Sequence, residues 1–117
     1  MAIFPWQKTK EIDRFANWLA DEFFSRIQPE LADEHFKSKN KNIENKKELK
    51  SMQNNAQKVN QAISQTIAEF RKFRESQSLG VYGKARFHMK FRDRLAELGY
   101  EKDIAKKLDE EILFKTA

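Results

Sequence analysis

Apolar residues recur along this chain at the three- and four-residue spacing of amphipathic helices. Four segments show it, at about Lys8–Ile27, 47–74, 84–98 and 101–114. No stretch reads as a strand, which would need an alternation of period two. The pattern therefore predicts an all-α fold.

The order of these segments predicts a four-helix domain with one long central helix and a C-terminal αα-hairpin. Pro29 ends the first helix or starts a short turn through Leu31 and Phe36. Gly99 stands where a left-handed residue closes a helix, so the hairpin should turn there. With 117 residues, three Gly and two Pro, residues 1–117 are expected to form one domain. The most polar stretch, 37–46, is predicted to be an exposed basic linker within it.

The long helix carries a heptad seam over more than three heptads: Leu49, Met52, Ala56, Val59, Ile63, Thr66, Phe70 and Phe73. Such a seam serves either a coiled coil with another chain or packing inside one domain. The apolar stripe is narrower in the first half, which is less suited to being covered by its own chain. We therefore predict that Leu49, Met52, Ala56 and Val59 form a dimer or partner interface.

Two aromatic residues of the first helix, Trp18 and Phe24, fall outside its apolar stripe. One interpretation is a hydrophobic docking surface. The other is a first helix that is covered on two sides by the rest of the domain. Both residues are retained as candidates for protein interaction.

Charge is unevenly distributed along the chain. The net charge is +5, made up of −3 over residues 1–36, +10 over 37–95 and −2 over 96–117. Arg86, Lys90 and Arg94 form one row at four-residue spacing, and a second group could extend it: Arg71, Lys72 and Arg74. This basic middle suggests nucleic-acid binding as the alternative function. The competing interpretations are a solvated helix face or neutralisation by the acidic ends.

No catalytic or metal-binding motif is present in the sequence. There is no Cys, and the residues three positions before His35 and His88 are Ala32 and Ala85 rather than Glu. We therefore expect no enzyme activity, no metal, no cofactor and no small-molecule substrate. No apolar run approaches the roughly 20 residues of a membrane span, and the first residues do not resemble a signal peptide. A cytoplasmic, non-enzymatic protein-interaction module that forms a homodimer through the long helix is the predicted function.

Overall fold

The computed structural model describes residues 5–38 and 45–116, and it confirms the all-α prediction. Five helices lie in these ranges: α1 (Pro5–Arg26), α2 (Pro29–Ser38), α3 (Lys46–Gln77), α4 (Val81–Glu97) and α5 (Lys102–Thr116). The long central helix and the C-terminal hairpin are both present. Of the predicted 37–46 linker, residues 39–44 lie outside the described residues, while its two ends belong to α2 and α3.

Helix α2 is the main departure from the predicted elements. The sequence suggested only a turn after Pro29, but Pro29 is the first residue of a ten-residue helix. Proline suits this position because its fixed φ matches the helix and its missing N–H has no partner to lose there. One face of α2 buries Ala32, His35 and Phe36, so tertiary packing stabilises a helix too short to persist alone.

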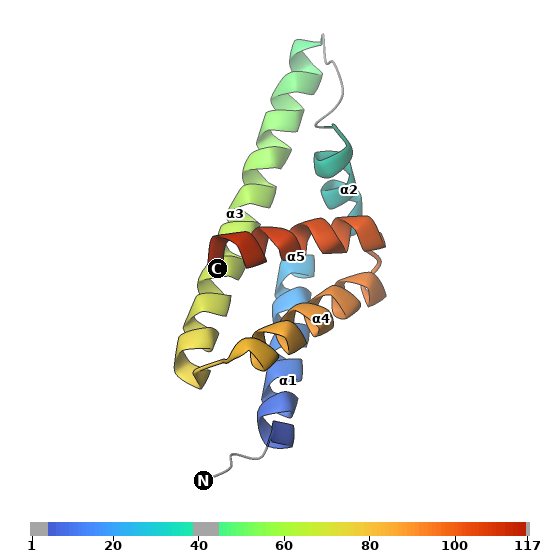
Figure 1. Ribbon diagram of the computed structural model, residues 1–117. Helices are drawn as coiled ribbons and strands as arrows, with labels where there is room; N and C mark the ends of the chain where they lie inside the picture. The colour runs from blue at the N-terminus through green and yellow to red at the C-terminus, as the bar shows by residue number, and fades with distance from the viewer. Residues whose placement is uncertain (1–4, 39–44, 117) are drawn as a thin grey trace.

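The helices form an elongated body of 62 × 24 × 21 Å. Figure 1 shows α4 and α5 side by side, crossing over α1 and α3, with α2 beside the upper half of α3. The most extensive helix contact is between α1 and α4. At about 1.5 Å per residue α3 is about 48 Å long. The layer formed by α4 and α5 covers only its lower half.

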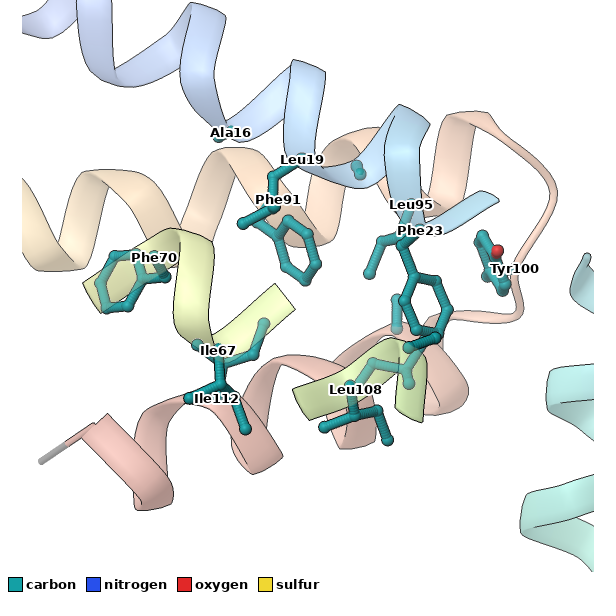
Figure 2. Packing of buried hydrophobic residues seen from close by; sticks show 14 of the residues in the cluster. Ala16, Leu19, Phe23, Ile67, Phe70, Phe91, Leu95, Tyr100, Leu108 and Ile112 are labelled. Carbon is teal, nitrogen blue, oxygen red and sulfur yellow. The ribbon is translucent and has the colours of Figure 1, made fainter. Parts of the chain in front are cut away.

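Aromatic rings fill the centre of the core. Phe70 of α3 and Phe87 of α4 are fully buried, and their rings stack with centroids 4.2 Å apart. Phe15 of α1 stacks on Phe73 of α3 at 4.0 Å. Figure 2 shows how α1, α3, α4 and α5 each direct apolar side chains into this cluster. The second half of the heptad seam, from Val59 onward, is thus used by the domain itself.

Gly99 has the predicted left-handed conformation, with φ +109°. We expect Gly99→Ala to lower the free energy of unfolding by about 1–2 kcal/mol, because a Cβ is strained in this region of φ. The added Cβ would meet Pro29 only at an ordinary 3.5 Å, so the cost lies in the backbone. Gly80→Ala is the control, since its φ of −85° suits alanine; it should cost less than half as much in urea denaturation. Equal losses would contradict this interpretation.

Tyr100, in the turn after Gly99, joins that turn to the end of α1. Its buried hydroxyl donates a hydrogen bond to the carbonyl oxygen of Ile27, and its ring contacts Phe23 and Phe24. Burial, with a smaller contribution from the charge of Glu30, raises the pKa of Tyr100 above its ordinary value. The folded state therefore favours the neutral phenol.

Stability should accordingly fall at alkaline pH. A pKa raised by folding contributes stability that is complete below the unfolded value of about 10 and is lost as the pH rises past it. Tyr100→Phe removes this ionisation and one hydrogen bond, so it should be about 1 kcal/mol less stable at pH 7 but lose less stability above pH 10. Denaturation from pH 7 to 11 tests this; parallel curves for the two proteins would contradict it.

Candidate protein-interaction surface

The first part of α3, Lys46–Lys58, extends beyond the packed body and is called the α3 arm here. In Figure 1 it rises past α2 and away from the layer formed by α4 and α5. It begins at Asn45, whose side chain accepts a hydrogen bond from the Lys47 backbone N–H at 2.9 Å. This cap gives one of the free N–H groups at the helix start a hydrogen-bond acceptor from the same segment, so no other helix has to supply it. The arm is about 20 Å long.

The four predicted interface residues of α3 become more buried along the helix from Leu49 to Val59. Leu49 is 39% exposed, Met52 and Ala56 are half-buried, and Val59 is fully buried. Val59 belongs to the domain core, so it cannot face a partner without rearrangement. The apolar stripe that remains partly open comprises Leu49, Met52 and Ala56, all on the arm.

The two candidate aromatic residues of α1, Trp18 and Phe24, differ in how far they are exposed to solvent. Trp18 is 45% exposed at the edge of a groove of about 300 Å³ between α1 and α3. Phe24 is half-buried, and its ring meets that of Tyr100 edge-on at 6.2 Å and 87°. Phe24 therefore completes the domain's own packing, while Trp18 is open to solvent.

Several large apolar residues that the sequence does not single out for interaction are exposed to solvent. The most exposed are Val81 at 87%, Phe114 at 73% and Tyr82 at 65%. They lie off the apolar stripes, at the start of α4 and the end of α5. Helical periodicity shows which residues face a core, but it does not show which of the others a neighbouring helix will cover.

Two cations of the predicted basic row are engaged by carboxylates of α1. Both Arg86 Nε and Nη2 donate to Asp13 at 2.9 Å. Arg94 donates to Asp21 at 2.9 Å and to Glu97 at 3.0 Å. These hydrogen bonds are the largest cause of the raised pKa of each arginine.

The remaining predicted nucleic-acid contacts are placed as follows. Arg71 donates to the backbone carbonyl oxygen of Lys115, and Arg74 donates to that of Thr116. Both carbonyls belong to the last turn of α5, where they have no partner within the helix. Lys72 lies 3.8 Å from Glu69 across an exposed turn of α3, and Lys90 is half-buried. Nucleic-acid binding stays a prediction. Four of its six proposed cations, Arg71, Arg74, Arg86 and Arg94, already donate hydrogen bonds to acceptors of the chain itself.

A buried pair that the sequence did not reveal joins α4 to α5. His88 Nδ1 and Asp109 Oδ1 lie 2.5 Å apart, and Arg92 Nε lies 3.2 Å from the other carboxylate oxygen. The imidazole also lies against the rings of Phe70 and Phe87. The carboxylate is therefore bonded on both sides, which offsets the cost of burying it.

Neither a metal-binding cluster nor a membrane-spanning helix is found in residues 5–38 and 45–116. Among these residues no three His, Asp or Glu side chains are placed to hold a metal ion. None of the described helices is long and apolar enough to cross a membrane. Comparisons with protein-family profiles, curated proteins and solved structures find no match for this chain.

Proposed function

We propose that this protein is a protein-interaction module that associates with a second copy of itself through the α3 arm. One observation carries the proposal: a helix whose seam is buried in the core continues past the core with the same seam still partly open. Burying the rest of Leu49 and Met52 would be favourable, since apolar surface contributes about 25 cal/mol per Å² removed from water.

The flanks of the open stripe suit a second copy of the arm. Gln53 and Asn55, the residues beside Met52 and Ala56, are uncharged. Four lysines of the arm lie outside the seam: Lys46, Lys47, Lys50 and Lys58. Two arms can approach through the seam without burying an unpaired charge, which would be costly.

Met52→Glu tests the proposal against a matched control, Gln57→Glu, which adds the same charge at an exposed position of the arm. Light scattering should show the native protein approaching twice its 13.9 kDa chain mass at high concentration. Met52→Glu should weaken association at least about 30-fold, because two partly buried Met side chains contribute about 2 kcal/mol together. Gln57→Glu should leave it nearly unchanged.

A native protein that stays monomeric at millimolar concentration would contradict the proposal. Equal weakening by both substitutions would also contradict it, because a general charge effect would then explain the result. Circular dichroism of each variant checks that the helices are retained, which is expected because Met52 lies outside the buried core.

A further inference from the structure

The groove between α1 and α3 brings an exposed aromatic ring together with two carboxylates. Its volume is about 300 Å³, and its lining includes Trp18, Leu19, Glu22 and Phe23 of α1 and Glu69 of α3. Leu19 and Phe23 are buried, so they form an apolar floor, while Trp18 is 45% exposed. Glu22 and Glu69 are half-buried. The groove therefore combines apolar surface, an open indole and negative charge.

The indole of Trp18 is supported by other rings of the domain. Its centroid lies 5.8 Å from that of Phe15, which in turn stacks on Phe73 at 4.0 Å. Both phenylalanines are partly buried and pack against the core. A ring held in this way loses little side-chain freedom when a ligand binds to it.

The two carboxylates of the groove are available to a cation from outside. Within residues 5–38 and 45–116, Glu22 forms no ion pair, and Glu69 forms only a contact of 3.8 Å with Lys72. Both side chains of that contact are well exposed, so it contributes little to stability. Asp13 and Asp21 of α1, by contrast, are engaged by arginines of α4.

A long basic side chain matches these features. Its methylene stem can lie on apolar surface while its charged head stays among polar groups. An indole face attracts a cation within about 6 Å, and neighbouring carboxylates attract it further. We propose that the groove binds an arginine-bearing peptide segment of a partner protein, with the guanidinium at Trp18, Glu22 and Glu69. Arg suits the site better than Lys, because its planar fork stacks on aromatic rings and bonds carboxylates.

Local charge favours such a partner although the chain as a whole is basic. Residues 1–36, which include α1, carry a net charge of −3 within a total of +5. Charges farther away than the Debye length of about 10 Å at 0.1 M salt are largely screened, so the carboxylates of the groove dominate. Arg26 also lines the groove, one turn after Glu22. It repels a cation at its own end and so directs the guanidinium to the Trp18 end.

Trp18 fluorescence tests the proposal in the Trp6→Phe variant, which leaves Trp18 as the only tryptophan. The probe is a short acetylated and amidated peptide of Ala, Gln and Leu with a central Arg. The emission should change saturably, with half-saturation below about 1 mM at 0.1 M salt. The same peptide with Glu in place of Arg should cause no saturable change, because its charge is repelled by both carboxylates.

Paired substitutions separate the groove from the general charge of the domain. Glu22→Gln/Glu69→Gln should weaken binding of the Arg peptide about tenfold, because two partly buried charges are lost. Glu11→Gln/Glu75→Gln is the matched control, since it removes one exposed carboxylate from each of the same helices outside the groove. It should leave binding nearly unchanged. Circular dichroism checks that both double variants keep their helices.

Three results would overturn the proposal. They are equal weakening by the two double variants, equal binding of the Arg and Glu peptides, and no saturable change in emission up to about 10 mM Arg peptide. None of them bears on self-association, because the α3 arm ends at Lys58 and the part of α3 that lines the groove begins at Gln65.

Discussion

Phe87→Ala is expected to lower the free energy of unfolding by about 4 kcal/mol, within the range for removing a buried aromatic ring. Phe87 is fully buried at the centre of the aromatic cluster. Its ring lies 4.2 Å from Phe70, 5.5 Å from Phe91 and 5.9 Å from Phe15. Three helices thus lose contacts at once, and a close-packed interior relaxes only partly into the cavity.

Urea denaturation measures this loss, and thermal unfolding should show a decrease in Tm of about 15 °C. Phe114→Ala is the matched control, because Phe114 is 73% exposed on α5; it should change the free energy of unfolding by less than about 0.5 kcal/mol. A cost below 1 kcal/mol for Phe87→Ala would mean that the helices do not meet around this ring.

Asp109→Ala is expected to lower the free energy of unfolding by about 3 kcal/mol. The carboxylate is buried between His88 and Arg92. Removing it leaves a buried imidazole nitrogen without its partner, and a lost charged hydrogen bond costs more than a neutral one. Asp109→Asn keeps an oxygen acceptor for His88 and should lose roughly half as much.

The control for this substitution is Asp93→Ala on α4, because Asp93 is exposed. It should leave the free energy of unfolding nearly unchanged in the same denaturation experiment. If Asp109→Ala proved as harmless as Asp93→Ala, the pair would not hold α4 against α5.

The sequence predicts those parts of the fold that depend on the residue pattern within a single helix. Ile63, Thr66 and Phe70 follow the heptad seam and are all buried. Gly99 adopts the left-handed conformation because a helix that turns back at once needs it. The sequence does not predict α2, because a proline can either end one helix or begin the next, and Pro29 begins α2.

The spacing of charged residues on α1 and α4 reflects how these two helices pack. Asp13 and Asp21 lie eight residues apart on α1, as do Arg86 and Arg94 on α4, and both ion pairs span 73 residues. The Tyr100–Ile27 hydrogen bond spans the same number. A constant separation shows that α1 and α4 run parallel in one register, which equal spacing of acidic and basic residues could have suggested.

The remainder depends on tertiary contacts that no local pattern encodes. His88 and Asp109 lie 21 residues apart on different helices, and neither belongs to a motif. Similarly, the seam of α3 has the same spacing where it is buried and where it projects. The narrower apolar stripe predicts an open first half that includes Val59, whereas the other helices bury Val59 and leave Met52 partly open.

Hydrogen exchange at low and high protein concentration tests the central claim most directly, because it localises any contact between copies. We predict that backbone amides of Lys46–Lys58 become more protected as concentration rises, while those of α4 and α5 do not change. The same protection at all concentrations along the arm, or a change confined to another helix, would contradict the assignment of the α3 arm as the interaction surface.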